Sequence, residues 1–314
     1  MKKYNKIIGV NFSHNTSACV LENGKVTKFL NEDRLVNIKK YETVPGIKSL
    51  FSLNKTFSDD VKIIGYASYF NITNKYKNIP EDLHKKYSFI PKFYDEKKHH
   101  IYHAICGFYF SNFNEALAII VDGGGAEPLI PSFQEIESIY YINNKFINEH
   151  FKHLSNKSIF PGYADVYNWS DYISRQKING TDVEYSSLAL GGHLFKVSCS
   201  KIGFKDKHGH NEAGKLMGLS SYKNKEEENK LDKEKVEIAH WTQQKHFERG
   251  CYLIEKALTY NKTKNIILSG GCALNCSNNF KFVKKYPKLN FFIDPLPEDQ
   301  GTAIGVAKYI YDYL

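Results

Sequence analysis

The segment HHIYHAICGFYFSNFNEALAIIVDGGG, residues 99–125, decides the fold that we predict. Its first part, His99–Tyr109, predicts a helix because apolar residues recur there at helical spacing. Its second part predicts a buried strand, Ala116–Val121, which runs into a glycine-rich loop that Asp122 opens. A polar loop at the carboxyl end of a buried strand is where α/β proteins place their functional groups.

The segments on either side of this stretch show that one order of elements occurs twice. An apolar strand at Lys6–Asn11 is followed by a polar turn, Ser13–Ser17, and then by a hairpin over residues 18–30 with an Asn-Gly turn. The strand at Ala116–Val121 is likewise followed by a polar loop and by a hairpin over residues 138–149. Duplication of this kind indicates two like lobes that face each other across a cleft.

The duplicated order is typical of the actin- and hexokinase-like superfamily, whose two hairpin loops hold nucleotide phosphates from opposite sides. We therefore predict a bilobed α/β chain of two RNase H-like lobes around a nucleotide and metal cleft. The predicted lobes are residues 1–115 and 116–314. Gly123 and Gly124 of the second loop become candidates for phosphate contacts. The element order leaves a second interpretation equally open, namely two unrelated α/β domains with ordinary hairpins.

A glycine turn in the last third of the chain adds a candidate nucleotide contact. The strand Asn265–Leu268 leads through the turn Ser269–Gly271 into a predicted helix. Backbone N–H groups in such a turn can approach a phosphate closely, although many α/β proteins carry this feature. Further along, Asp299 opens the final predicted helix.

Length and composition exclude several classes of protein. The chain has 314 residues, of which 42% are hydrophobic and 25% charged, as in ordinary globular proteins. It has no apolar run of the roughly 18 residues that a membrane span needs, and no secretion signal at its start. The six cysteines form no CxxC pair, so we predict a cytoplasmic protein with reduced core cysteines and no membrane partner. The net charge of +9 favours a solvated lysine-rich surface over nucleic-acid contact, and it also suits anionic substrates.

Two histidines and two aspartates are the candidate metal ligands. His99 and His103 are four residues apart on the predicted helix, so both imidazoles lie on one face. Asp122 and Asp299 each follow a predicted strand. Two imidazoles with carboxylates suit a divalent ion such as iron, manganese, magnesium or zinc, with open positions for phosphate oxygens or water. Each residue also has a purely structural interpretation. The histidines would be ordinary hydrogen-bonded residues on a helix face, Asp122 would be a turn residue, and Asp299 would be a helix N-cap.

Four further residues are candidates for substrate contacts. His14, in the first polar turn, suits a phosphate contact or a general base, and Arg34 suits an anion. Lys215 lies beside glycines, as a phosphate-binding lysine would, and Glu212 is a nearby carboxylate that suits a general base. Taken singly, each of these residues also fits an ordinary loop position.

Five segments together resemble the O-carbamoyltransferases of NodU and TobZ type, which act in nodulation-factor and antibiotic biosynthesis. They run in the family's order along nearly the whole chain. The segments are GVNFSHNTSACVLENGKV (9–26) with NEDR (31–34), HHIYHAICGFYFSNFNEALAIIVDGGG (99–125), GKLMGLSSY (214–222), ILSGGCALNCSNN (267–279) and DPLPEDQGTAIGVA (294–307). Five ordered motifs are far more specific than any one of them.

The resemblance implies an actin-like domain related to the subunit that forms threonylcarbamoyl-adenosine in tRNA. The family's metal ligands, which are thought to hold iron, fall on His99, His103, Asp122 and Asp299. Its nucleotide-binding segment falls on Gly270, Gly271 and Asn275.

The remaining site residues of the family also have counterparts. His14 and Arg34 match its N-terminal site residues. The acid that precedes the lysine of the GK motif, a candidate base for the acceptor hydroxyl, falls on Glu212, where the family pattern would have aspartate.

The activity that the resemblance implies is carbamoyl transfer. The donor would be carbamoyl-adenylate, derived from carbamoyl phosphate and ATP, and the acceptor a hydroxyl of a small molecule or nucleotide. Family members usually continue into a YrdC-like domain that makes the donor, whereas this chain ends at Leu314, so we expect a separate YrdC-like protein as partner. Two alternatives stay open, a transfer directed at tRNA or another nucleic acid and a non-catalytic nucleotide-binding regulatory module. A homodimer also stays open.

Overall fold

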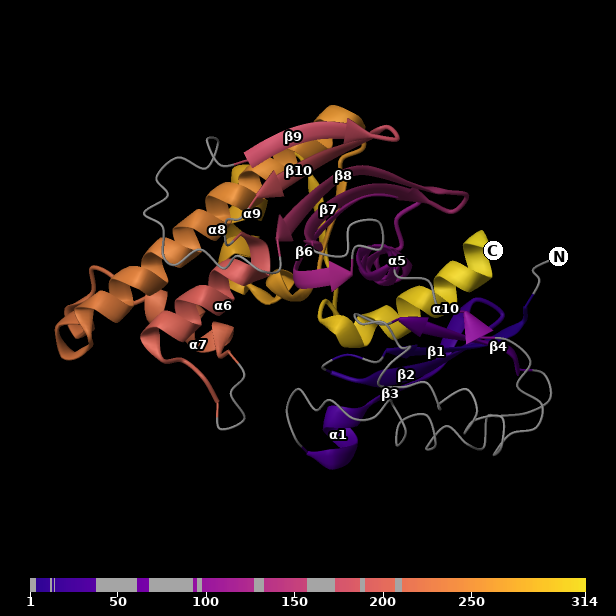
Figure 1. Cartoon of the computed structure of the whole chain (residues 1–314), viewed down its shortest axis with the longest axis horizontal. Helices are drawn as coiled ribbons and strands as arrows, with labels where there is room; N and C mark the ends of the chain where they lie inside the picture. The colour runs from indigo at the N-terminus through magenta and orange to yellow at the C-terminus, as the bar shows by residue number, and fades with distance from the viewer. Residues whose placement is uncertain are drawn as a thin grey trace.

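Two β-sheets with two helices between them form the framework of the computed structural model (Figure 1). The structure describes residues 4–11, 13, 15–37, 61–67, 93–94, 98–126, 133–156, 173–186, 190–206 and 211–314. Within this part of the chain, no helix is both long enough and apolar enough to cross a bilayer.

The first sheet contains the N-terminal strands in the order β3-β2-β1-β4-β5. Strands β1 and β2 pair antiparallel, β2 and β3 form the predicted hairpin, and β1 and β4 are parallel. A short helix, α1 (Glu32–Val36), follows the hairpin. The strands are β1 (Lys6–Asn11), β2 (Ser17–Glu22), β3 (Lys25–Asn31), β4 (Val61–Ala67) and β5 (Phe93–Tyr94).

The second sheet has the order β12-β11-β6-β7-β8-β10-β9. Strands β6, β7 and β8 form an antiparallel meander, while β11 pairs parallel with both β6 and β12. The strands are β6 (Glu115–Ala126), β7 (Phe133–Asn143), β8 (Ile147–Asn156), β9 (Ile173–Ile178), β10 (Thr181–Ser186), β11 (Asn265–Ser269) and β12 (Asn290–Ile293).

The helices divide between the two faces of the second sheet. Helices α5 and α10 lie between the sheets, and α8 packs on the outer face of the second sheet beside α6 and α9 (Figure 1). The α-helices are α5 (His99–Ser111), α6 (Gly191–Ile202), α7 (Ala213–Ser220), α8 (Lys233–Tyr260), α9 (Cys276–Lys285) and α10 (Thr302–Tyr313). The 3₁₀ helices are η3 (Glu226–Lys230), η4 (Gly271–Leu274) and η5 (Asp299–Gly301).

Strand β6 is buried on both faces, and its alternation decides which side chains meet α5. Leu117 and Ile119 belong to the core under α8, whereas Ala118 and Ile120 pack against α5. Because side chains alternate along a strand, the next residue on the α5 side is Asp122. The hydrophobic pattern of β6 therefore points a carboxylate at the helix that carries the two histidines.

Helix α10 packs on the first sheet, although it ends the chain. Ala303 and Ala307 join the core formed by β1, β2, β4 and α5. The approach is close, because a Cβ at Gly9 would lie 1.9 Å from the carbonyl oxygen of Ala303, and one at Gly305 would lie 2.0 Å from the carbonyl oxygen of Tyr102. The final helix, predicted within residues 116–314, thus contributes to the core of the first lobe as well.

The structure refines three predictions from the sequence. Asp122–Ala126, predicted as a loop, continues β6 through a bulge at which the register with β7 shifts between Val121 and Gly125. Cys276, predicted in the core with the other cysteines, is exposed, and Cys272 is half-buried. The charged run at residues 223–235 is largely exposed and forms η3 and the start of α8.

The close contact of α10 with α5 predicts a specific sensitivity to volume. Gly305→Ala should destabilise the chain by about 2–3 kcal/mol, because the new methyl group meets backbone rather than a movable side chain. Gly218→Ala in α7 is the matched control, since a Cβ there meets nothing within 4 Å, and it should stabilise by up to about 1 kcal/mol. Urea unfolding measures both, and equal midpoints for the two variants would contradict this packing.

Candidate metal centre

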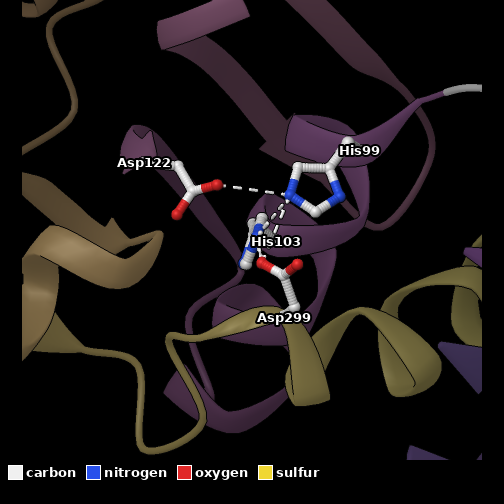
Figure 2. Close-up of side chains that lie close together, drawn as sticks. All are labelled: His99, His103, Asp122 and Asp299. Carbon is white, nitrogen blue, oxygen red and sulfur yellow. Dashed lines mark hydrogen bonds and ion pairs between the residues drawn. The ribbon is translucent and has the colours of Figure 1, made fainter. Parts of the chain in front are cut away.

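Four side chains from three distant segments converge between the two sheets (Figure 2). One ligand atom from each of His99, His103, Asp122 and Asp299 lies within 4.8 Å of the others, and all four residues are buried. Nε2 of His99 lies 3.2 Å from Nε2 of His103, 3.3 Å from Oδ2 of Asp122 and 3.4 Å from Oδ1 of Asp299. Nε2 of His103 lies 3.6 Å from the same Oδ1 of Asp299. These are the four residues that the sequence predicts as metal ligands.

Each ligand is positioned by a different part of the fold. The two histidines occupy the first two turns of α5, four residues apart and on one face. Asp122 ends the α5-facing side of β6, and Asp299 begins η5, directly before α10. Because α10 and β6 both pack on α5, the two carboxylates approach the histidines from two different directions (Figure 2).

The charges of the two aspartates dominate the electrostatics of this group. Burial by itself would lower the pKa of His99, but the charge of Asp299 and the hydrogen bonds to both aspartates outweigh it and raise the pKa to about 10. Burial would likewise raise the pKa of Asp122, but the hydrogen bond with His99 outweighs it and lowers the pKa well below its usual value. The cluster therefore favours an ionised Asp122 and a positive charge beside it.

The donor set fits a divalent metal ion. Both imidazoles present Nε2 to the centre, and each aspartate presents one carboxylate oxygen. Two nitrogens and two oxygens at one buried point are the donors that divalent transition metals bind. An ion would also supply the positive charge that two buried carboxylates require.

The turn after β11 fixes the orientation of Asp122. The N–H of Gly271 donates to Oδ1 of Asp122 at 2.9 Å, which leaves Oδ2 facing His99. Gly270 has a φ of 83°, and a Cβ there would lie 2.5 Å from the carbonyl oxygen of Val121. Only glycine suits this position, so the predicted nucleotide turn also holds a metal-ligand candidate.

The glycine loop of β6 is braced by residues that the sequence analysis missed. A Cβ at Gly192, in the first turn of α6, would lie 2.7 Å from the nitrogen of Gly123. His193 is buried, and burial lowers its pKa to about 4, so the ring is neutral and accepts from the amide of Gln134 at 2.7 Å. The Gly-Gly-His sequence at the start of α6 was the available signal for this contact.

The predicted nucleotide residues lie beside a cavity between α8 and the η4–α9 segment. Gly270 and Gly271 form the turn above it, and Asn275 caps α9 while donating to Oε1 of Gln243 at 2.7 Å. The side chain of Asn275 therefore positions the helix. The cavity is lined by Ile119, Val121, Glu137, Gly191, His246, Arg249, Gly250, Leu253, Ile254, Leu268, Ser269, Cys272, Ala273, Asn279 and Phe282.

A buried ion network borders this cavity and ties α8 to the second sheet. The guanidinium of Arg249 donates to Oε2 of Glu137 at 2.6 Å and to Oε2 of Glu184 at 2.8 Å. Burial would raise the pKa of Glu137, but the charge of Arg249 outweighs it and lowers the pKa to about 2. Arg249 therefore holds two buried carboxylates in their ionised form next to the cavity wall.

Other predicted site residues are not brought to the four-residue cluster. Lys215 forms an ion pair with Oε2 of Glu212 at 2.7 Å, and its side chain is 65% exposed. The N–H of Glu212 donates to the carbonyl of Phe204, beyond the far end of α6, whose 12 residues span about 18 Å. Arg34 lies exposed on α1, and His14 falls outside the described residues.

Comparisons with known proteins give a family match over part of the chain and one relative over nearly all of it. Residues 229–308 match the sequence model of the carbamoyltransferase N-terminus family. An uncharacterized protein of Methanocaldococcus jannaschii is 24% identical over 312 residues, which cover 96% of this chain and 56% of that protein. The chain thus spans about half the length of the curated relative it matches.

Solved structures share the fold at low sequence identity. HypF from T. kodakarensis has a TM-score of 0.62 and 13% identity, with 99% of this chain and 48% of that chain covered. The activator of 2-hydroxyisocaproyl-CoA dehydratase from Clostridium difficile, with bound ADPNP, has a TM-score of 0.53 and 12% identity, with 98% and 94% covered. A ROK-family glucokinase from Streptomyces griseus, in complex with glucose and AMPPNP, has a TM-score of 0.52 and 10% identity, with 96% and 98% covered. The chain has the bilobed, actin-like α/β fold that the duplicated element order predicted.

Removal of one imidazole should greatly weaken the binding of a metal ion at the cluster. The unaltered chain should bind one divalent ion, and His103→Ala should weaken that binding by more than the roughly 10–100-fold that loss of an outer-shell partner costs. His240→Ala, on α8, is the matched control and should bind as the unaltered chain does. Elemental analysis and titration with Mn²⁺ measure the effect, and full occupancy in the His103 variant would contradict the assignment.

Proposed function

We propose that the chain transfers a carbamoyl group from carbamoyl-adenylate to a hydroxyl acceptor, at a divalent metal held by His99, His103, Asp122 and Asp299. The proposal places the chain with the O-carbamoyltransferases of NodU and TobZ type. The convergence of those four side chains within 4.8 Å, from segments up to 200 residues apart, is the observation that carries it. The family match over residues 229–308 supplies the reaction class.

The adenylate would lie along the turn that joins β11 to η4. Gly270 and Gly271 bring this turn close to β6, since a Cβ at Gly270 would lie 2.5 Å from the carbonyl oxygen of Val121 and one at Gly271 would lie 3.1 Å from Oδ1 of Asp122. The cavity beside the turn, between η4 and α8, is mostly apolar but has room for only a few water molecules, so we propose that the purine ring lies at its opening. This arrangement brings the phosphate end of the nucleotide next to Asp122 and hence next to the metal.

The transfer exchanges a mixed anhydride bond, between the carbamoyl carbon and a phosphate oxygen, for a carbamate ester bond. The acceptor oxygen attacks the carbamoyl carbon, the bond from that carbon to the phosphate oxygen breaks, and AMP leaves with the bonding electron pair. A bound divalent ion would act as a Lewis acid and neutralise the charge on the departing phosphate. The residues of the chain hold the donor in place, exclude water from the buried cluster and accept the proton of the acceptor hydroxyl.

His14 is the proposed general base. It lies between Ser13 and Asn15, and both of these neighbours contact η5, which carries the metal-ligand candidate Asp299. Glu212, the second candidate from the sequence, is ion-paired with Lys215 beyond the far end of α6. We therefore assign Glu212 to the support of α7 rather than to proton transfer.

The activity can be tested without knowledge of the acceptor. The chain should be mixed with carbamoyl phosphate, ATP, Mn²⁺ and a YrdC-like protein, and candidate hydroxyl acceptors should be screened by mass spectrometry for a gain of one carbamoyl group. We expect AMP release and a carbamoylated product that both disappear with His103→Ala. If every acceptor yields AMP at the same rate with that variant as with the unaltered chain, carbamoyl transfer at this site is wrong. A product on RNA whose formation falls steeply with added salt would identify a nucleic-acid acceptor.

The base assignment predicts a contrast between two variants. His14→Gln should lower kcat by about 10²–10⁴-fold, which is the usual contribution of a general base. Glu212→Gln should leave kcat nearly unchanged, because the carboxylate is paired with Lys215 and lies away from the cluster. Steady-state rates of AMP release measure both, and the reverse order would return the role to Glu212.

A further inference from the structure

The described residues of the first polar turn, Ser13 and Asn15 to Ser17, are buried and contact η5. Oγ of Ser13 lies 2.5 Å from Oδ2 of Asp299 and 2.9 Å from Oδ1 of Asn11, and we assign its single proton to the nearer and charged acceptor, Asp299. The amide of Asn15 donates to Oε1 of Gln300 at 3.1 Å, and Oγ of Ser17 donates to the carbonyl of Gln300 at 2.8 Å. Three side chains of one turn therefore fix the short helix that carries a metal-ligand candidate.

The turn is itself held in one conformation. Oγ1 of Thr16 donates to the carbonyl of Ser13 at 2.8 Å, and the amide of Asn11 donates to the carbonyl of Asn15 at 3.2 Å. Asn15 has a φ of 64°, in the left-handed region that asparagine tolerates. Ser13 is thus presented to Asp299 by a structured turn at the end of β1.

The two carboxylate oxygens of Asp299 have different contacts. Oδ2 accepts from Ser13, while Oδ1 faces Nε2 of His99 at 3.4 Å and Nε2 of His103 at 3.6 Å. Asp122 is arranged in a similar way, because its Oδ1 accepts from the N–H of Gly271 at 2.9 Å, while its Oδ2 faces His99 and accepts from the N–H of Gly124 only at 3.4 Å. In each carboxylate, the shorter hydrogen bond holds one oxygen and the other oxygen faces the histidines.

The environment makes this hydrogen bond hard to replace. Ser13 and Asp299 are each 2% exposed, so bulk water has little access to Oδ2. A hydroxyl that donates to an ionised carboxylate forms a stronger bond than one that donates to a neutral acceptor. Loss of the hydroxyl would remove this donor from a buried carboxylate oxygen and weaken the restraint on rotation about the Cβ–Cγ bond of Asp299.

We propose that Ser13 is a positioning residue for the metal centre, which holds Asp299 so that only Oδ1 is offered to the ion. The inference rests on the proposed metal site and deepens it. The sequence predicted that the first polar turn contacts phosphate. In this proposal, the turn instead orients a metal ligand. Because the turn belongs to the first sheet and Asp122 to the second, the metal would be held from both lobes at once.

The test is the affinity and the visible spectrum of Co²⁺ bound to the whole chain. Ser13→Ala should raise the dissociation constant for Co²⁺ by about 10–100-fold, as loss of an outer-shell partner does at other metal sites. The absorption bands of Co²⁺ should also shift, since a released Asp299 can offer both oxygens and change the coordination number. Ser17→Ala is the matched control, because it removes a hydroxyl of the same turn that bonds the backbone of Gln300 and not the ligand.

A second pair of variants guards against loss of folding. Ser13→Thr and Ser13→Val have nearly the same shape and differ in the hydroxyl, so only Ser13→Thr should retain tight binding and the original spectrum. The role of Ser13 would be overturned if Ser13→Thr and Ser13→Val had equal Co²⁺ affinity and equal spectra. The same holds if Ser13→Ala and Ser17→Ala had equal affinity and spectra. Either result would leave the metal centre itself in place. If the unaltered chain and His103→Ala bound Co²⁺ equally, the metal centre would fail, and the role of Ser13 would fail with it.

Discussion

The proximity of two buried carboxylates is the constraint on which the centre of this structure depends. Asp122 and Asp299 are 6% and 2% exposed, and both approach the same imidazole nitrogen. Buried like charges are tolerated only when a positive charge lies between them. A protonated His99 meets this need in the protein alone, which is why its pKa is raised to about 10. A divalent ion would meet it better, since it carries two charges and binds all four side chains.

The fold holds this centre by close contacts between backbones. Glycines at Gly9 and Gly305 let α10 approach β1 and α5 without intervening side chains, and η5 directly precedes that helix. Asp299 is therefore fixed relative to the first sheet, while Asp122 directly follows Val121, the last residue of β6 paired in the ladder before the bulge. A relative movement of the two lobes would alter the distance between the carboxylates. The proposed ion would thus stabilise one arrangement of the lobes over others.

The sequence predicted the features that depend on local periodicity. The spacing of His99 and His103 placed both imidazoles on one helix face, and Asp122 and Asp299 were identified as residues that follow strands; all four lie in the cluster. Asp122 was expected in a loop, so the alternation along β6 that directs it toward α5 became visible only in the structure. The place of Glu212 could not be predicted, because the length and direction of α6 decide it. The donors to the carboxylates, Ser13 and Gly271, also could not be predicted, since each contact joins segments that are far apart in the chain.

The turn at Gly271 links the two parts of the proposed site. Its N–H, which a phosphate-binding turn would offer to the nucleotide, is already donated to Asp122. An anionic nucleotide bound at this turn would therefore lie close to the carboxylate of Asp122. Two negative charges that lie close together inside a protein repel each other strongly. The repulsion disappears when a divalent ion lies between the phosphate and Asp122. Metal and nucleotide should consequently bind with positive coupling, since each lowers the electrostatic cost of the other at one shared turn.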